Sequence, residues 1–378
     1  MQRTSSSLSH SSPPRRSSPS SRRSVAAYAR TNPTCPGPCI GSCAACAFTI
    51  SNDAVIRKLF LGIDGGGTKT HFVVVDSDGN PLAAHEGPGS YHVELGIEGL
   101  RQVLFDGMAA VLAQAAIDAS ALTYAFFGLP AYGEDSEAQP LLDDIPAPLL
   151  GHRRYRCGND MICAWAGSLG GQAGINIVAG TGSIGYGERR GRSARAGGWG
   201  EIFGDEGSAY WIAVQALNVF SRMSDGRLAR GPLHGILRAE LEVVADLEIC
   251  ARVLNAHSRE RIAAMAPLVA RAARQGDIGA MRIFDEAARE LAELVEAVRR
   301  ALLFEPDEPV PVSYSGGVFE AGTLILDPLR RHLAYQSASY KFRPPMLTPS
   351  LGAAIYAAKL ADEPFSAAAM QRLASIAC

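Results

Sequence analysis

The chain has 378 residues, of which 36 are Lys or Arg and 38 are Asp or Glu, while 47% are hydrophobic and 20% are charged. This composition excludes a wholly disordered chain, and the near-zero net charge gives no global basicity for binding nucleic acid. No apolar run approaches the roughly 18 residues of a membrane-spanning helix. We therefore expect a cytoplasmic protein with a sizeable core that binds neither membrane nor nucleic acid.

The first 54 residues differ in composition from the rest. Residues 1–24 contain eleven Ser, and the whole segment has six Arg against one acid, Asp53. Such a segment cannot bury enough apolar surface to offset chain entropy, so we expect it to be disordered. An organellar transit peptide and a start site placed too far upstream are the alternatives.

The eight cysteines form two groups. Four crowd into the tail, where short spacings suggest zinc or an iron–sulfur cluster, but the spacing fits no standard site and chance composition is favoured. The other four are dispersed among apolar residues, which indicates reduced and mostly buried thiols. The tail cysteines are Cys35, Cys39, Cys43 and Cys46, and the dispersed ones are Cys157, Cys163, Cys250 and Cys378.

The body opens with strands. Apolar runs at residues 59–63, 72–75 and 81–84, separated by glycine-containing turns, predict a three-stranded meander. Helical spacing of apolar residues predicts a helix over 100–115, and residues 122–127 are the next predicted strand.

A second unit repeats this arrangement. Residues 175–179 predict a buried strand, residues 180–187 a glycine-rich turn, and residues 198–207 a loop that leads into an apolar helix. The two units therefore look like rough duplicates.

The remaining chain is mostly helical. Residues 205–303 have almost wholly helical periodicity, residues 310–314 predict a strand, and residues 350–360 predict a final Ala-rich helix. Alternating strands and helices predict an α/β protein, for which we expect two lobes with a cleft between them. The expected division is 55–170 for the N-terminal lobe and 171–361 for the C-terminal lobe, with 362–378 packing back on the N-terminal lobe.

The first candidate site follows the first strand, where Asp64 leads into three consecutive glycines. Glycines let backbone N–H groups converge on phosphate oxygens, a hydroxyl can add a donor, and Asp64 is a candidate ligand for magnesium. An ordinary hairpin turn needs fewer glycines, and the frame of a P-loop is absent. The candidate nucleotide contacts are Gly65, Gly66, Gly67, Thr68 and Lys69.

The second candidate lies at residues 179–185, which formally match the dinucleotide fingerprint G-x-G-x-x-G. That fingerprint requires a helix at its third glycine, whereas a turn-rich stretch follows here. A second phosphate-holding hairpin, with Thr181 and Gly182 as candidate contacts, fits better.

The third candidate is the glycine-rich stretch at residues 197–208, where Asp205 and Glu206 precede a helix. Asp205 could simply be a helix N-cap. A cap does not require five glycines and the indole of Trp199, whereas carboxylates bind paired hydroxyls and a flat ring covers a sugar face. Contact with a polyol is therefore favoured, and both roles can coexist.

The fourth candidate is Asp160, which follows a short predicted strand at residues 153–157 and precedes a helical run. Taken alone, an acid at this place is more often an N-cap than a base.

Together these segments resemble the N-acetylglucosamine kinase branch of the BadF/BadG-type ATPases, within the actin-like and sugar-kinase superfamily. The resemblance covers about residues 58–361, and its motifs are GIDGGGTKT, VAGTGS, GGWGEIFGDEGSAYWIA and SYSGGVF. It implies a two-lobed actin-like ATPase (ribonuclease H-like) fold with duplicated domains around a central cleft. The third motif is the specific one, because the first two are widely shared.

The resemblance also implies roles for individual residues. Asp160 matches the catalytic aspartate, which accepts the proton of the sugar 6-hydroxyl as that hydroxyl attacks the γ-phosphate of ATP. Asp64 lies where relatives carry an acid near Mg²⁺. Thr68 and Thr181 match phosphate contacts, Gly316 and Gly317 lie at the adenosine end, and the matched sugar contacts are Ser183, Gly198, Trp199, Gly200 and Asp205.

Two positions depart from the pattern, because Tyr91 and Ile184 stand where relatives carry a sugar-binding Asn. Tyr91 remains a candidate substrate contact. The implied function is an ATP-dependent kinase that phosphorylates the 6-hydroxyl of N-acetylglucosamine or a related amino sugar, and such kinases are often homodimers. The alternatives are a kinase for glucosamine, N-acetylmannosamine, glucose or a muramic derivative, an activator ATPase with an iron–sulfur cluster, and a sugar-sensing regulator.

Overall fold

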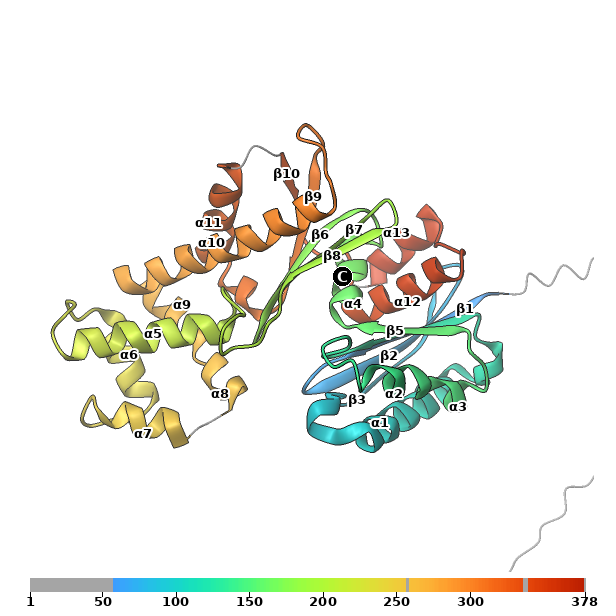
Figure 1. The fold of residues 1–378 in the computed structure, drawn as a ribbon, viewed down its shortest axis with the longest axis horizontal. Helices are drawn as coiled ribbons and strands as arrows, with labels where there is room; N and C mark the ends of the chain where they lie inside the picture. Colours follow the sequence, from blue (N-terminus) through green and yellow to red (C-terminus); the bar gives the residue numbers. More distant parts are fainter. Residues whose placement is uncertain (1–56, 256–257, 336–338, 377–378) are drawn as a thin grey trace, which may run out of the picture. The chain divides into compact units, whose positions relative to one another are not determined.

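The computed structural model describes residues 57–255, 258–335 and 339–376 (Figure 1). The expectations for the tail, for its four cysteines and for Cys378 lie outside these residues. Residues Val55–Cys378 form one compact unit. Within the described ranges, no helix is both long and apolar enough to cross a membrane.

The first sheet contains the predicted meander. Its strand order is β3-β2-β1-β4-β5, with β1, β2 and β3 antiparallel and β4 and β5 parallel to β1. The central strand β1 is apolar at almost every position because both of its faces are covered. The strands are β1 Leu59–Gly65, β2 Lys69–Asp76, β3 Pro81–Pro88, β4 Tyr124–Leu129 and β5 Tyr155–Asn159.

The second sheet has the same topology. Its order is β8-β7-β6-β9-β10, again with an antiparallel meander of three strands, β6, β7 and β8, and with two parallel strands on the other side of β6. The predicted duplication is therefore confirmed. The strands are β6 Gly174–Ala179, β7 Ser183–Arg189, β8 Arg192–Gly197, β9 Val310–Ser315 and β10 Tyr340–Phe342.

Helices cover both faces of the first sheet. On one face, Leu61 and Ile63 of β1 pack with Leu104 of α1, whereas Phe60 packs on the other face with α4 and α12. The alternation follows from the two-residue period of a strand. The helices are α1 His92–Ala115, α2 Gln139–Asp144, α3 Pro146–Leu150, α4 Met161–Leu169, α12 Pro349–Leu360 and α13 Ala367–Ile376, with a 3₁₀ turn, η1, at Ala119–Ala121.

The position of α12 differs from the expected division of lobes. The expectation placed this helix in the C-terminal lobe, but it packs on β1 and β4 of the first sheet and on helix α4. Leu373 of α13 packs there too, against Val73 and Val75. The lobe boundaries remain a proposal, in which residues 349–360 join the first lobe because their apolar face is buried there.

The predicted helical region, α5 to α10, lies between β8 and β9 of the second sheet, and α11 follows β9. The apolar face of α10 is buried by this region and by the sheet. The helices are α5 Ala209–Ser224, α6 Pro232–Glu240, α7 Glu248–Asn255, α8 Arg259–Ala263, α9 Ala266–Arg274, α10 Ile278–Ala301 and α11 Thr323–Ala334, with a 3₁₀ turn, η2, at Gly317–Ala321.

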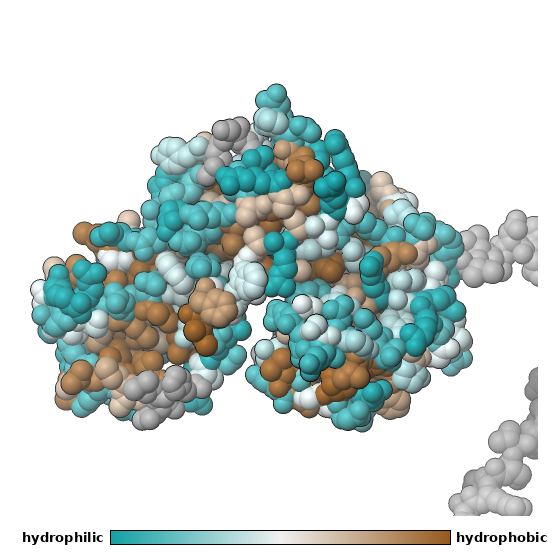
Figure 2. Space-filling view, viewed as in Figure 1, coloured by the Kyte–Doolittle hydropathy of each residue, from teal (hydrophilic) through white to brown (hydrophobic). Residues whose placement is uncertain are grey.

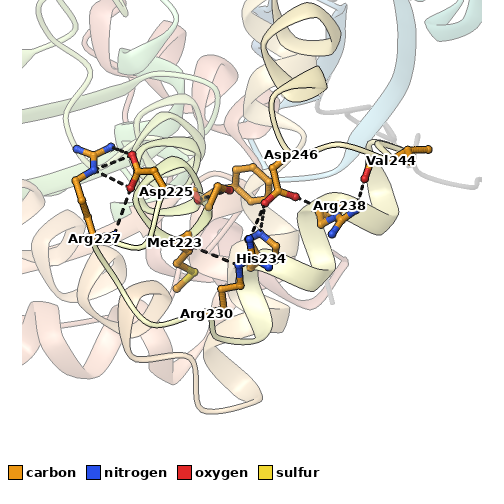
Figure 3. Close-up of polar contacts among 10 residues, drawn as sticks. Met223, Asp225, Arg227, Arg230, His234, Arg238, Val244 and Asp246 are labelled. Atoms are coloured by element: carbon orange, nitrogen blue, oxygen red, sulfur yellow. Dashed lines mark hydrogen bonds and ion pairs between the residues drawn. The ribbon is translucent and has the colours of Figure 1, made fainter.

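A polar cluster joins α6 to the segment before α7 (Figure 3). The Asp246 carboxylate lies 2.9 Å from Nε2 of His234 and 3.2 Å from guanidinium nitrogens of both Arg230 and Arg238. The His234 ring stacks on Phe220 of α5, with centroids 4.8 Å apart. These contacts hold α5, α6 and the start of α7 together at the edge of the helical region.

Candidate active site

A cavity of about 940 Å³ lies among loops of both sheets. Its walls come from the carboxyl ends of β1 and β5, from the β6–β7 turn, and from the loop after β8. Twelve of the sequence-predicted residues line it: Asp64, Gly65, Tyr91, Asp160, Thr181, Gly182, Ser183, Gly198, Trp199, Gly200, Asp205 and Gly316. The structure thus brings together segments that are far apart in the chain.

The β1–β2 turn contributes less to this wall than the sequence motif suggests. Gly65 lines the cavity, and a Cβ there would lie 2.7 Å from the carbonyl oxygen of Gly128, so only glycine fits this strand end. Lys69 points instead to Glu86 on β3, with Nζ 3.1 Å from the carboxylate. The other predicted turn residues are not among the lining residues of the cavity: Gly66, Gly67 and Thr68.

The β6–β7 turn is held tightly against its surroundings. The Gly180 N–H donates to the Gly182 carbonyl at 2.9 Å, and the Ala209 N–H at the start of α5 donates to the Gly180 carbonyl at 2.8 Å. Gly316, with φ +101°, passes so close to the Ala179 carbonyl that a Cβ would collide with it. The β6–β7 turn and the segment at Gly316 therefore place backbone atoms at one side of the cavity.

A second cavity of about 530 Å³ adjoins the first through Gly180 and Thr181, which line both. Gly317, another predicted nucleotide contact, lines this second space. Its other walls are mainly apolar and include Ile212 and Phe284. A flat, weakly polar group such as a nucleobase suits such a wall.

Asp160 occupies the N-cap position of α4, but its side chain makes no capping hydrogen bond. Asn159 supplies that bond, because its Oδ1 accepts from the Met161 N–H at 3.1 Å. Burial raises the pKa of Asp160 to about 6. The nearby Glu134 carboxylate also raises this pKa, and the Met161 N–H lowers it. The Asp160 carboxylate is therefore free to act on a ligand in the cavity.

Asp64 lies at the end of β1, close to Asp160. Burial, and after it the charge of Asp160, raises the pKa of Asp64 to about 8. A divalent cation next to Asp64 would relieve this repulsion, and carboxylate oxygens are ligands that Mg²⁺ prefers. The residues present therefore fit a magnesium ion held by Asp64 together with nucleotide phosphates.

The loop between β8 and α5 needs its glycines. Gly197, Gly198, Gly200 and Gly207 all have φ between +71° and +87°, a backbone region that side chains disfavour. The loop leaves Trp199 with 69% of its surface exposed while it lines the cavity.

The capping role considered for Asp205 is wrong. Ser208 is the N-cap of α5, with its hydroxyl accepting from the Trp211 N–H at 3.1 Å. Gly207 turns the chain with φ +80° before the helix, so Asp205 lies three residues too early and points into the cavity wall. The Asp205 carboxylate instead bonds to the guanidinium of Arg259.

Sequence reasoning missed four charged residues that line the cavity: Glu134, Arg195, Glu201 and Arg259. Arg195 donates to the Gly198 carbonyl at 2.9 Å and lies 4.0 Å from Glu134. Glu201 lies within the glycine-rich stretch at residues 197–208, and the other three lie outside the motifs. Only the fold brings the other three to the site.

The chain is similar to several known proteins. A model of the BadF/BadG/BcrA/BcrD ATPase family matches residues 61–357. An N-acetyl-D-glucosamine kinase of Dictyostelium discoideum is 30% identical over 312 residues, which are 80% of this chain and 98% of that relative. An N-acetylmuramic acid/N-acetylglucosamine kinase of Clostridium acetobutylicum is 31% identical over 282 residues, 73% of this chain and 90% of that relative.

A solved structure resembles the whole body. The crystal structure assigned to an N-acetylglucosamine kinase of Chromobacterium violaceum is 30% identical, with a TM-score of 0.62, over 80% of this chain and 99% of that one. With the duplicated sheets, this match confirms the expected two-lobed, actin-like ATPase fold.

Proposed function

Because the chain belongs to the BadF/BadG/BcrA/BcrD ATPase family, we propose that it is an ATP-dependent amino sugar kinase that phosphorylates the 6-hydroxyl of N-acetylglucosamine or a close relative. The observation that carries the proposal is the position of Asp160. Its uncapped, half-buried carboxylate lines the same cavity as the β6–β7 turn and as Trp199 and Asp205 of the loop between β8 and α5, residues 198–208, which we call the sugar loop.

Phosphoryl transfer requires positioning and charge neutralisation more than covalent help. In our proposal the backbone of the β6–β7 turn and Thr181 hold the phosphates, and the apolar second cavity holds the adenosine. Magnesium, when bound next to Asp64, supplies positive charge to the phosphates. Asp160 accepts the proton of the sugar 6-hydroxyl, and Asp205 accepts hydrogen bonds from other sugar hydroxyls.

The β1–β2 turn takes part in this proposal through closure. Gly66, Gly67 and Thr68 lie outside the cavity wall, and a Cβ added at Gly67 would meet no atom within 4 Å, so phosphate can approach it freely. Closing the site around both ligands would bring this turn to the phosphates and exclude water, which otherwise hydrolyses ATP.

Two features leave the sugar open within this class. Tyr91 and Ile184, the two positions at which the resemblance implies a sugar-binding Asn, both line the cavity. A bulkier phenol and a lost amide change both the room and the hydrogen bonds for sugar substituents. The relative from Clostridium acetobutylicum carries both N-acetylmuramic acid and N-acetylglucosamine in its name, so both belong among the test sugars.

The activator ATPase is the less favoured function. An iron–sulfur cluster needs closely spaced thiolates. The three described cysteines lie on β5, α4 and α7, with Cys157 and Cys163 buried and Cys250 exposed, in line with the expectation of mostly buried thiols. We further propose that the kinase acts in the cytoplasm, where ATP is available, and forms a homodimer.

A coupled ADP-release assay tests the function. The panel contains N-acetylglucosamine, N-acetylmuramic acid, N-acetylmannosamine, glucosamine and glucose, each with MgATP. We expect turnover with at least one N-acetylated sugar, 6-phosphate as the product by NMR, and loss of most turnover in Asp160→Asn with sugar and ATP binding retained. ADP release that no sugar accelerates, or a product phosphorylated elsewhere, would contradict the proposal.

A further inference from the structure

Arg259 connects two segments that are distant in sequence. It is the first residue of α8, whose start is capped by the Ser258 hydroxyl accepting from the Arg261 N–H at 3.2 Å. Its guanidinium bonds to the carboxylate of Asp205, 54 residues earlier, and its Nε lies 3.4 Å from the Glu201 carboxylate. One guanidinium therefore hydrogen-bonds one acid of the loop between β8 and α5 and lies within ion-pair distance of the other.

The Asp205 carboxylate needs such a partner. Its side chain is only 3% exposed, and removing a carboxylate from water favours the neutral form unless a charge or donors compensate. Burial raises the pKa of Asp205 and Glu201 raises it further, whereas Arg259 and the backbone at Ser183 and Gly200 lower it. The charged groups that face Asp205 are thus Arg259 from α8 and Glu201 from its own loop.

The backbone at Asp205 is also unusual. Its φ is +56°, in the left-handed region that costs energy for residues with a side chain. A bond from a fixed guanidinium helps to hold the carboxylate in one direction despite this cost. Arginine suits the task better than lysine, because its planar fork can donate to two carboxylates at once.

We propose that Arg259 is a positioning residue for sugar recognition, which keeps Asp205 ionised and aimed into the cavity so that it can accept hydrogen bonds from sugar hydroxyls. This inference rests on the proposed function and adds a residue that no sequence motif indicates. Arg259 acts through Asp205, so its loss affects the sugar more than the nucleotide.

The location of the guanidinium suggests the main competing role. It lies so close to Gly182 of the β6–β7 turn that a Cβ there would collide with it. A cation at this place could instead contact the phosphates of ATP directly. The two roles differ in which substrate loses affinity.

The test compares Arg259→Met and Arg259→Lys with a matched control, Arg261→Met. Arg261 is exposed, lies on the same helix, and takes part in no ion pair among the described residues. For Arg259→Met we expect the Kd and KM for the sugar to rise tenfold or more, KM for ATP to change less than twofold, and kcat at saturating sugar to fall less than tenfold. Arg261→Met should match the wild type.

A pH series distinguishes positioning from simple loss of packing. In Arg259→Met, Arg259 no longer lowers the pKa of Asp205, so that pKa should rise. As the pH is lowered, sugar affinity should therefore begin to fall at a higher pH in this variant than in the wild type. Arg259→Lys should restore the wild-type pH dependence but only part of the affinity, because one ammonium cannot bridge both acids.

Several results would overturn the proposal. They are unchanged sugar affinity, tighter sugar binding, an increase confined to KM for ATP, and lower affinity without any shift of the pH dependence. If circular dichroism shows that Arg259→Met does not fold, Arg259→Lys alone tests the proposal, through its partial loss of sugar affinity. Failure of the proposed function is separate, because wild-type protein would then turn over no sugar in the panel.

Discussion

Asp160 illustrates how one residue at a helix start is released for chemistry. Asn159 supplies the cap of α4, so the Asp160 carboxylate is left facing the cavity. Its pKa of about 6 lies above that of an ordinary Asp, mainly because of burial. In the proposed reaction Asp160 accepts a proton and must be ionised, so we expect this shift to set how activity depends on pH.

We predict that kcat/KM for the sugar rises with pH through an apparent pKa near 6 and then levels off. The Glu134 carboxylate contributes to the raised pKa of Asp160, so Glu134→Gln should move this limb to lower pH. Glu137→Gln is the matched control, since Glu137 is an exposed acid in the same loop that does not line the cavity. A limb that stays in place in Glu134→Gln would show that another group titrates.

Glu296 on α10 has a structural role and a depressed pKa. Its buried carboxylate accepts from Arg299 at 2.8 Å, from Arg300 at 2.9 Å, and from the Tyr340 hydroxyl. These donors, with Arg299 first, lower its pKa from 4.5 to about 2. The ionised form therefore stabilises the fold fully above pH 4.5, and this stabilisation is lost as the pH falls toward 2.

Glu296→Gln should lower the free energy of unfolding by about 2 kcal/mol at pH 7, with the difference shrinking toward pH 3. Urea unfolding at both values measures this. Glu293→Gln, which removes an exposed pairing with Arg289 on the same helix, should cost under about 0.5 kcal/mol. Equal losses at pH 7 and pH 3 for Glu296→Gln would contradict the electrostatic explanation.

At the scale of elements, apolar runs predict this fold well. The apolar run in β2 gives that strand, and the helical period of α10 gives both the helix and its buried face. The start of α5 was harder, because Asp205 and Ser208 are both good caps and only the left-handed turn at Gly207 selects Ser208. Arg259 could not be found, since no local pattern signals a contact across 54 residues.

The contact between α4 and α12 depends on glycine. A Cβ at Gly352 of α12 would collide with the Cys163 carbonyl and the Gly167 N–H of α4. We predict that Gly352→Ala separates the helices and lowers stability by about 1–3 kcal/mol. Gly235→Ala is the control, because Gly235 is exposed on α6 with no atom within 4 Å of an added Cβ.

Thermal unfolding measures both glycine variants. Gly235→Ala should leave stability unchanged or raise it by up to about 1 kcal/mol through helix propensity. An equally neutral Gly352→Ala would show that α4 and α12 can move apart freely.

At the scale of the whole body, β7 of the second sheet contacts the helices of the first. Glu188 on β7 accepts from the Tyr356 hydroxyl at 2.8 Å and from Lys359 of α12 at 2.6 Å. The Lys359 ammonium also lies 4.7 Å from the centre of the Trp165 ring on α4. This cluster joins β7 of the second sheet to helices that cover the first, so we expect motion that opens or closes the cavity to turn about it.

The apolar side chains of the sugar loop indicate what closure would cover. Trp199, Ile202 and Phe203 are 69%, 88% and 74% exposed. Figure 2 shows that hydrophobic patches lie among hydrophilic residues on the face of the molecule that it draws. Exposed apolar groups beside a ligand cavity gain free energy when a partner surface covers them. We therefore predict that binding of sugar together with a non-hydrolysable ATP analogue closes the body around the Glu188 cluster.

Small-angle scattering and tryptophan fluorescence measure this closure. The radius of gyration should fall when both ligands are added. Emission should shift to the blue because Trp199 becomes covered, whereas Trp165 is already buried and Trp211 is partly buried against the core. Trp199→Phe should lose the blue shift, which assigns the signal to the loop, and sugar or nucleotide alone should give a smaller change. Identical compactness with and without both ligands, together with an unmoved emission maximum, would mean that the described arrangement is already the catalytic one and that water is excluded by the ligands themselves.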